Sequence, residues 1–390
     1  MRILHVIPSL AAVHGGPSVA IRLMERAAIA EGFHVETAST DDEGPGQGNG
    51  KPCDVPLSEE AVTRWYFRKR LDFYKVAPRF VLWMHRNVKR FDVVHIHALF
   101  SFTSIVAAAI ARRASVPYVI RPLGVLNDYG IRHRRSWLKS LSLKLVEAPL
   151  LRRAAAVHFT AIAERDEAAQ LGLTLHPVVI PLGIEVPAPN LQGRLAERDK
   201  SSKNVRLLYL SRLDPKKNLE GLIRAVAILD KSDAHFHLTV AGTGDPTYCA
   251  DLRVLAQDMR VEHRITWTGH VSGDAKATVF QNAEIFVLPS FSENFGIAVV
   301  EAMMYGLPVI LTPGVAVSET VSSAGAGLAV NPDPQAIADG IQFYLDNPNI
   351  REECGHRAID LATSHYSMEG MGRQLSALYH EIQIAGAPRA

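Results

Sequence analysis

VRLLYLSRL, residues 205–213, is an apolar strand pattern that ends in a polar turn. An amphipathic helical pattern follows it over residues 219–229. The chain opens in the same way, because RILHVIPSL, residues 2–10, precedes a helical pattern over 17–31. A strand, a turn and a helix at the start of both halves predict two α/β domains of the Rossmann-like kind.

Short apolar runs alternate with helical patterns along the rest of the chain, which is typical of a parallel sheet covered by helices. The predicted strands span residues 3–8, 34–37, 93–96, 118–121, 156–159, 178–180, 206–210, 237–241, 265–268, 285–288 and 309–311. Further helices are predicted over 296–305 and 334–346.

A segment rich in proline, glycine and polar residues separates the two halves and predicts a linker. We therefore expect a first domain over residues 1–183, a linker over 184–203 and a second domain over 204–366. A last helix within residues 367–390 is expected to cross back onto the first domain.

Length and composition favour a two-domain protein. The 390 residues exceed what one core usually organises, and 47% of them are hydrophobic. A net charge of +2 argues against a nucleic-acid partner. Cys53, Cys249 and Cys354 lie far apart, which fits neither a zinc site nor a disulfide framework and favours a reducing, cytoplasmic location. No uncharged apolar run is long enough to span a membrane.

LSRLDPKKN, residues 210–218, places Arg212 and Lys217 in the turn after a predicted strand. Side chains at the carboxyl end of a parallel strand point into the ligand crevice of an α/β sheet. Arginine grips phosphate oxygens with two donors, and lysine supplies a mobile point charge. The alternative is that both are solvated loop cations.

VAGTGD, residues 240–245, is a second strand that runs into a glycine-rich turn. Gly242 and Gly244 would allow a ligand to approach the backbone closely. A dinucleotide fingerprint would need another glycine where Thr247 stands, so the sequence does not predict a nicotinamide cofactor.

PSFSENFGIAVVEAMMYGLPVI, residues 289–310, is the most specific motif. Glu293 lies in a loop, Asn294, Phe295 and Gly296 precede a predicted helix, and Glu301 lies within that helix. The free amides at such a helix start suit a phosphate. The two carboxylates would repel a bare phosphate, so sugar and ribose hydroxyls are their natural partners. Alternatively, Glu293 caps the helix and Glu301 is a surface residue.

In combination, these motifs resemble the family 4 glycosyltransferases, a retaining group with the GT-B fold. The spaced glutamates of ENFGIAVVEAM, residues 293–303, are the most typical feature, and GGP, DVVHIHA, SRLDPKKN, AGTGD, TWTGHV and the last helix extend the resemblance over nearly the whole chain. It implies two Rossmann-like domains that face each other across a cleft. It also implies a nucleotide diphosphate-sugar as donor.

The resemblance implies a role for each matching position. Arg212 and Lys217 would neutralise the donor diphosphate, and Glu301 would accept hydrogen bonds from the ribose. Glu293 would hold the donor sugar. Further donor contacts are expected from Gly242, Gly244, His270, Asn294, Phe295 and Gly296.

In the first half, Gly15 and Gly16 stand just before a predicted helix, in a loop that faces the diphosphate and the acceptor in the family. His97, at the end of the strand DVVHIH, matches the family's active-site histidine near the transferred sugar. The alternative for His97 is a satisfied core histidine. We expect His95 to lie on the opposite face of this strand and to pack there.

The expected chemistry needs no metal or other cofactor. Breaking the bond to the anomeric carbon leaves negative charge on the diphosphate, which Arg212, Lys217 and helix-end amides would stabilise. The Asp-x-Asp motif that holds a metal in many other glycosyltransferases is absent from the sequence. The resemblance implies front-face attack, with Glu293 as a binding residue. UDP-sugars are preferred over GDP-sugars as the expected donor.

Two basic stretches of the first half, residues 64–90 and 132–153, also contain aromatic or other large apolar side chains. Such a pattern fits helices that lie on an anionic membrane surface. The candidate contacts with membrane or acceptor are Arg68, Lys69, Arg70, Arg134 and Arg135. The acceptor would then be a saccharide, lipid-linked, at the inner face of the plasma membrane. The alternative is two ordinary amphipathic helices whose aromatic residues face the core.

Two other functions remain open from the sequence. A sugar-nucleotide epimerase can share this architecture, although the motif set argues against it. An inactive nucleotide-sugar-binding protein would be expected to lack Arg212, Lys217 or Glu301, and all three are present.

Overall fold

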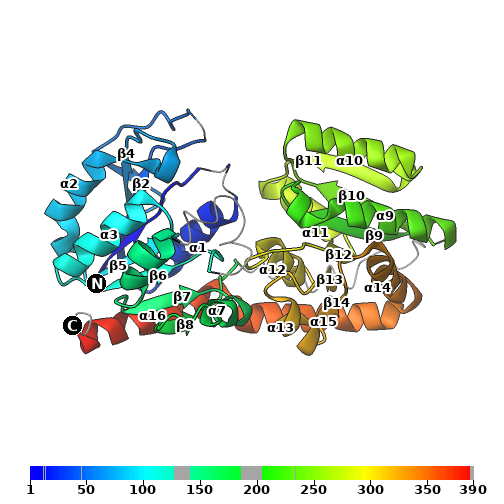
Figure 1. Cartoon of the computed structure of the whole chain (residues 1–390). Coiled ribbons are helices and arrows are strands. Elements are labelled where there is room, and N and C mark those ends of the chain that lie inside the picture. Colours follow the sequence, from blue (N-terminus) through cyan, green and yellow to red (C-terminus); the bar gives the residue numbers. More distant parts are fainter. Residues whose placement is uncertain are drawn as a thin grey trace. The chain divides into compact units, whose positions relative to one another are not determined.

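A computed structural model of the chain describes all residues other than 12, 14, 45, 127–140, 186–203, 233 and 387–390. The chain divides into two compact units (Figure 1). Unit 1 comprises Met1–Gly183 together with Met368–Ala390, and unit 2 comprises Ile184–Ser367. Among the described residues, no helix is both long enough and apolar enough to cross a membrane.

The described part of unit 1 contains a sheet of eight strands in the order β3-β4-β2-β1-β5-β6-β7-β8. Neighbouring strands are parallel except β3 and β4, which are antiparallel. The strands span Arg2–Val6 (β1), His34–Thr40 (β2), Pro56–Glu59 (β3), Val62–Phe67 (β4), Val93–His97 (β5), Tyr118–Arg121 (β6), Ala156–Phe159 (β7) and Pro177–Val179 (β8).

Helices follow most of these strands, and the last helix of the chain returns to unit 1, where it packs against α1. They span Gly16–Ala30 (α1), Phe73–Lys75 (η2), Pro78–Asn87 (α2), Val88–Arg90 (η3), Phe102–Arg113 (α3), Leu143–Glu147 (η4, a π-helix), Ala148–Leu151 (α6), Ile162–Ala169 (α7) and Met368–Ala385 (α16).

The two faces of the unit 1 sheet are both buried but differ in polarity. Residues two apart in a strand share a face. One face carries Leu4, Ile96, Ile120 and similar residues, which form one core cluster with residues of α2, α3 and α6. The other face carries a row of buried polar residues: His5, Thr37, Arg64, His95, His97, Arg121 and His158.

Strand β4 corrects the prediction of a basic amphipathic helix at residue 64. Arg64 is fully buried within this strand and donates to both carboxylate oxygens of Glu25 on α1, at 2.9 and 2.8 Å. Thr37 donates to the same carboxylate. A two-pronged arginine–carboxylate pair neutralises the charge, so a cation can occupy a buried strand position.

The described part of unit 2 contains a parallel sheet of six strands in the order β11-β10-β9-β12-β13-β14. The strands span Val205–Leu210 (β9), Phe236–Ala241 (β10), Ile265–Gly269 (β11), Ile285–Leu288 (β12), Val309–Leu311 (β13) and Gly327–Ala329 (β14). All predicted strands are present with ends shifted by a few residues, whereas β3, β4 and β14 were not predicted.

The helices of unit 2 begin close to the ends of these strands. They span Pro215–Lys217 (η5), Leu219–Leu229 (α9), Asp230–Ser232 (η6), Pro246–Asp258 (α10), Glu262–Arg264 (η7), Gly273–Asn282 (α11), Ile297–Met304 (α12), Ser318–Ser323 (α13), Pro334–Asp346 (α14) and Pro348–His365 (α15). Asn218 caps α9, because its side chain accepts from the amide of Gly221.

Candidate functional site

The residues predicted from the second half of the sequence meet at one edge of the unit 2 sheet. His270 follows β11, Gly242 follows β10, Arg212 follows β9 and Glu293 follows β12. These four strands are neighbours and parallel, so their carboxyl ends share one edge. Ligands of open α/β sheets bind at this edge.

Lys217 and Glu293 form an ion pair, in which Nζ of Lys217 donates to Oε2 of Glu293. The backbone supports the pair, because the amide of Phe291 donates to the carbonyl of Lys216 at 2.8 Å. That bond ties the loop after β12 to the turn after β9. The two side chains are only 13% and 21% exposed. An incoming phosphate can compete with Glu293 for this lysine.

Arg212 is held more loosely. Its side chain is 57% exposed and reaches Asp214 at 3.4 Å, a contact that contributes little to stability at such exposure. Burial lowers the pKa of the neighbouring Lys217 to about 8, with a smaller contribution from the charge of Arg212. At neutral pH the amine of Lys217 is still protonated, so both side chains offer positive charge.

Positions 242 and 244 need glycine for a steric reason that the sequence did not reveal. A Cβ on Gly242 would lie 1.9 Å from the carbonyl oxygen of Ser211, and one on Gly244 would lie 2.0 Å from that of Leu213. These glycines therefore allow close approach to the turn that carries Arg212, which is a reason in addition to the predicted approach of a ligand. Their contact with the donor stays a prediction.

The start of α12 presents free amides, as the sequence predicts. Gly296 adopts φ 88°, which favours glycine, and no side chain caps the helix there. No acidic residue lies in the first turn. Asn294 is half-buried in the preceding loop, whereas Phe295 is buried and packs edge-on against Tyr366 at 5.7 Å. The side chain of Phe295 is therefore part of the core, and its contact with the donor stays a prediction.

Glu301 pairs with a residue that sequence reasoning missed. Lys276, on α11, donates to Oε1 of Glu301 at 2.6 Å. Oε2 of Glu301 is buried and has no partner. Burial raises the pKa of Glu301, and the charge and hydrogen bond of Lys276 oppose that rise. Since the two residues lie on different helices, no spacing in the sequence signals the pair.

The predicted glycine loop of unit 1 ends at the start of α1. Gly15 adopts φ 67° and stands at the cap position, where no side chain makes a capping bond. Gly16 and Pro17 open the helix, and no acidic residue lies in its first turn. The start of α1 therefore resembles the start of α12 as a place for an anion.

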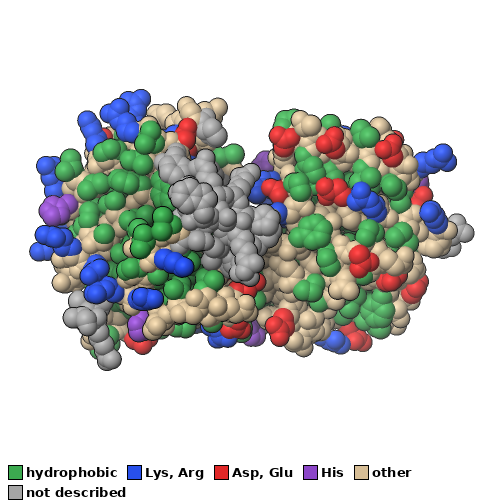
Figure 2. Space-filling model, in the orientation of Figure 1, with side chains coloured by type: hydrophobic (Ala, Val, Ile, Leu, Met, Phe, Trp, Pro, Cys, Tyr) green, Lys and Arg blue, Asp and Glu red, His purple; other side chains and the backbone are tan. Residues whose placement is uncertain are grey.

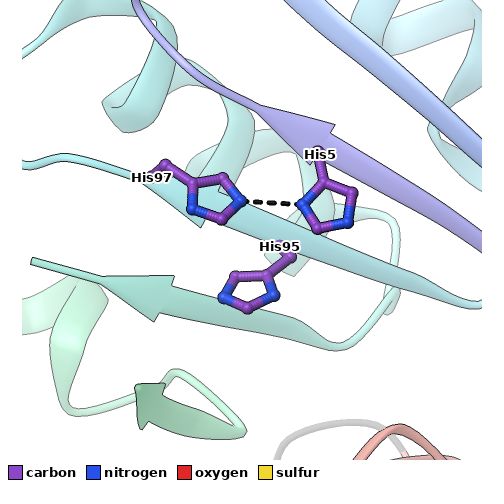
Figure 3. A group of neighbouring side chains, drawn as sticks. All are labelled: His5, His95 and His97. Carbon is purple, nitrogen blue, oxygen red and sulfur yellow. Dashed lines mark hydrogen bonds between the residues drawn. The ribbon is translucent and has the colours of Figure 1, made fainter. Parts of the chain in front are cut away.

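His97 is the last residue of β5 and is fully buried. Its Nε2 lies 2.8 Å from Nδ1 of His5 on β1 (Figure 3). The prediction for His95 is wrong about its face: residues two apart share a face, and the rings of His95 and His97 stack with centroids 4.5 Å apart. His95 is packed, because its Nδ1 lies 2.8 Å from the hydroxyl of Tyr379 on α16.

Arg121 lies beside His97 on the neighbouring strand β6. It is 2% exposed, and burial lowers its pKa to about 10. Burial, more than any neighbouring charge, also lowers the pKa of His5 to about 3 and that of His97 well below its usual range. His97 is therefore an uncharged ring at neutral pH.

The cations of residues 64–90 are paired to a larger extent than their sequence predicts. Lys69 donates to Asp42 and Asp72 and is 9% exposed, so it is not free to meet a membrane. Arg68 and Arg70 are exposed. Arg134 and Arg135 lie outside the described residues.

The aromatic residues of residues 64–90 also correct the membrane interpretation. Phe67 and Phe80 are buried in the core cluster, and Trp65 and Trp83 pack against it. They therefore belong to the core, and the stretch is not a single helix on a lipid surface.

Two family models match this chain in succession. A glycosyl transferase 4-like domain matches residues 15–183. A model described as glycosyl transferases group 1 matches residues 195–360. Together they cover most of the sequence.

Curated relatives match over part of the chain. An alpha-D-kanosaminyltransferase of Streptomyces kanamyceticus is 29% identical over 250 residues, which are 62% of this chain and 64% of the relative. A D-inositol 3-phosphate glycosyltransferase of Corynebacterium glutamicum is 30% identical over 208 residues, or 51% of this chain and 49% of the relative. The chain thus spans about half to two thirds of the length of these relatives.

Solved structures match over nearly the whole chain. A sucrose-phosphate synthase from Thermosynechococcus elongatus has a TM-score of 0.78 at 21% identity and covers 99% of this chain and 100% of its own. Anabaena HepE in complex with UDP-glucose has a TM-score of 0.76 at 18% identity, covering 98% and 100%. At these identities the likeness shows the fold.

Proposed function

Because the chain belongs to the family 4 glycosyltransferases of the GT-B fold, we propose that it transfers a sugar from a nucleotide diphosphate-sugar to a saccharide acceptor. The observation that carries the proposal is the edge of the unit 2 sheet, where Lys217, Arg212 and the free amides of α12 offer positive charge. Their positive charge matches the negative charge of a diphosphate.

The proposed chemistry is electrostatic. As the bond to the anomeric carbon breaks, its electron pair goes to the diphosphate oxygen. Fixed donors aimed at the developing charge lower the barrier, and a single such donor is typically worth about 10²–10³ in rate. Arg212 and Lys217 fill this role with no metal ion. We propose that the diphosphate displaces Glu293 from Lys217 and that Glu293 then accepts from hydroxyls of the donor sugar.

We further propose that the sugar keeps its anomeric configuration. In front-face attack, the departing phosphate oxygen accepts the proton of the acceptor hydroxyl while the new bond forms on the same face. No carboxylate need act as a nucleophile, so Glu293 binds. Rescue of a Glu293→Gln variant by azide, with an inverted product, would contradict this mechanism.

For the nucleotide we propose UDP. Anabaena HepE binds UDP and UDP-glucose in its solved structures. In this chain, Glu301 has a free oxygen for a ribose hydroxyl, and exposed His270 follows β11 at the same sheet edge, where its backbone would meet the base. Ribose recognition alone does not separate UDP from GDP.

The acceptor proposal rests on the surface of unit 1. Figure 2 shows hydrophobic side chains bordered by lysine and arginine on the visible face of this unit. On α2, Leu82 is 59% exposed and lies one turn from the exposed Arg86. On η4, Leu145 is 68% exposed beside Lys144. We propose that these exposed leucines and cations of unit 1 meet the anionic inner face of the plasma membrane, where a lipid-linked saccharide would serve as acceptor.

Binding to vesicles tests the membrane proposal. We expect the protein to sediment with anionic vesicles at low salt and to be released by high salt, and a Leu82→Ser, Leu145→Ser variant to sediment less. Equal binding to neutral vesicles would contradict the electrostatic part.

A donor screen tests the main proposal. The purified protein is mixed with UDP-, GDP- and ADP-sugars, and melting temperature and slow release of nucleotide diphosphate are measured with and without EDTA. We expect one nucleotide to stabilise the protein and to be released from its sugar, unchanged by EDTA. Activity that requires manganese would overturn metal independence. Recovery of an intact but epimerised nucleotide sugar would favour the epimerase.

A further inference from the structure

Buried histidines form two hydrogen-bonded groups beneath α1 and α16. In the first group His5 and His97 share one bond of 2.8 Å. In the second, His95 joins Tyr379 at 2.8 Å and His158 at 3.3 Å, and His158 joins the carbonyl of Ile180 at 2.8 Å. The second group uses both nitrogens of His95. The first leaves Nε2 of His5 and Nδ1 of His97 buried without a partner.

These rings do not form a convincing metal site, although nitrogens of His5, His95 and His97 lie within 4.8 Å of one another. The three rings are stacked, with interplanar angles of 20–24°. Nδ1 of His5 and Nε2 of His97 point at each other and are already joined by a hydrogen bond, whereas the ring of His95 lies nearly parallel to theirs, so its in-plane nitrogens do not point between them (Figure 3). Because both nitrogens of His95 are in use, a metal ion bound to His95 would displace its bond to Tyr379 or its bond to His158.

We propose that His5 is a positioning residue for His97: its hydrogen bond occupies Nε2 of His97, holds the ring in one orientation, and leaves Nδ1 for a hydroxyl of the transferred sugar. This inference rests on the proposed glycosyl transfer.

The hydrogen bond between the two rings couples their tautomers. Both rings are uncharged, so one nitrogen of the pair donates and the other accepts. If His5 donates, Nδ1 of His97 carries the hydrogen, and if His97 donates, Nδ1 is an acceptor. Either arrangement leaves Nδ1 as the only unpaired polar atom of His97. An unpaired buried polar group is costly, and a substrate hydroxyl can remove that cost.

The backbone around His97 agrees with a functional position. Ala98, the next residue, adopts φ 88°, which is strained for a residue with a side chain. Its amide donates to the carbonyl of Arg121 at 2.9 Å, which fixes the end of β5 against β6. The backbone of His97 is thus held by β6, and the orientation of its ring depends on His5.

Three variants of His5 test whether the position of its polar atom matters or only the presence of one. His5→Asn keeps a polar atom near the place of Nδ1, His5→Gln moves it to the place of Nε2, and His5→Leu removes it. We expect kcat to fall about tenfold in His5→Leu and His5→Gln and to stay near the wild-type value in His5→Asn. The KM for the donor should stay within about twofold of the wild-type value in all three variants. Thr37→Val is the matched control, because Thr37 is fully buried on the same face of the sheet beside His5 and does not contact His97. This control should keep the wild-type kcat.

Two further readouts distinguish positioning from stability. Nitrogen chemical shifts of labelled histidine should report a hydrogen-bonded Nε2 of His97 in the wild type and the loss of that hydrogen bond in His5→Gln. In a His97→Ala background, changing His5 should have no further effect on kcat, since His5 acts through His97. If His5→Leu does not fold, the Asn and Gln variants carry the comparison.

Three results would overturn the inference. They are equal kcat in all His5 variants, additive losses with His97→Ala, and a stoichiometric zinc ion on the purified protein. Failure of the proposed function has a different signature, because the wild type itself would then turn over no nucleotide sugar.

Discussion

Both units hold polar groups at or beneath the carboxyl edge of a largely parallel sheet, but these groups differ in charge and in exposure. In unit 2 the groups are charged and joined across elements, as in the pairs Lys217–Glu293 and Lys276–Glu301, and they remain partly exposed. In unit 1 His5 and His97 are uncharged and fully buried. Charged pairs that can open suit a charged ligand such as a diphosphate. Uncharged donors and acceptors suit sugar hydroxyls, which carry no charge.

The largest expected effect removes the cations of unit 2. We expect a protein with both Arg212→Ala and Lys217→Ala to lose at least about 10³ in kcat/KM, because these are the two cations that we propose to stabilise the leaving diphosphate. Steady-state release of the nucleotide diphosphate measures this. Lys231→Ala is the matched control, since Lys231 is an exposed lysine of the same unit, on η6. If the double variant were as active as Lys231→Ala, the cations of unit 2 would not be the groups that act on the diphosphate.

The next effect concerns Lys276. Glu301 must be ionised to accept from ribose hydroxyls, and burial raises its pKa whereas Lys276 opposes that rise. Lys276→Met should therefore move the acid limb of donor binding to higher pH and weaken binding about tenfold at pH 6, with a smaller loss at pH 8. Calorimetry with the nucleotide diphosphate at both pH values measures it.

Lys276→Arg keeps the charge and serves as the control. A loss of affinity that is the same at both pH values would mean that Lys276 acts on the ligand or the fold and not through the charge of Glu301.

The smallest effect concerns stability in unit 1. Glu147, 1% exposed, accepts from the amide of Phe100, and burial raises its pKa to about 7 from the usual 4.5. Between these values the folded protein keeps a proton that the unfolded chain releases, so the free energy of unfolding falls as pH rises and levels off above pH 7. The total loss is about 3 kcal/mol at most.

Glu147→Gln keeps an acceptor for Phe100 and carries no charge. It should raise the melting temperature by about 5 °C at pH 8 and leave it unchanged at pH 5. Thermal unfolding followed by circular dichroism measures this. An equal rise in melting temperature at both pH values would contradict this account, because the ionised carboxylate of Glu147 would then not be what destabilises unit 1.

Local sequence patterns predicted the strands that carry the candidate site. Strand, turn and helix are local, so the ends of β9 and β12 and the start of α12 follow from spacing alone. The pairing of Lys276 with Glu301 joins two helices, and the pairing of His5 with His97 joins two strands. Such contacts depend on tertiary packing, which no short motif records.

In the basic stretch of unit 1, residues 64–90, the local sequence pattern was misleading. The cations of residues 64–90 suggested a solvated surface, but Arg64 lies in the buried strand β4 because Glu25 of α1 pairs with it. Sequence reasoning counted charges along the segment and did not see carboxylates that arrive from elsewhere, such as Glu25 and Asp42.

The return of α16 to unit 1 sets an order for synthesis on the ribosome. Unit 2 is a continuous segment, whereas unit 1 needs both Met1–Gly183 and Met368–Ala390. Tyr379 and Met371 contact His95 and Gly183, so these bonds cannot form until the end of the chain has been translated. Unit 1 is therefore the first unit to be synthesised and the last to complete its fold. Until α16 has been translated, the sheet face that it covers is a natural target for chaperones.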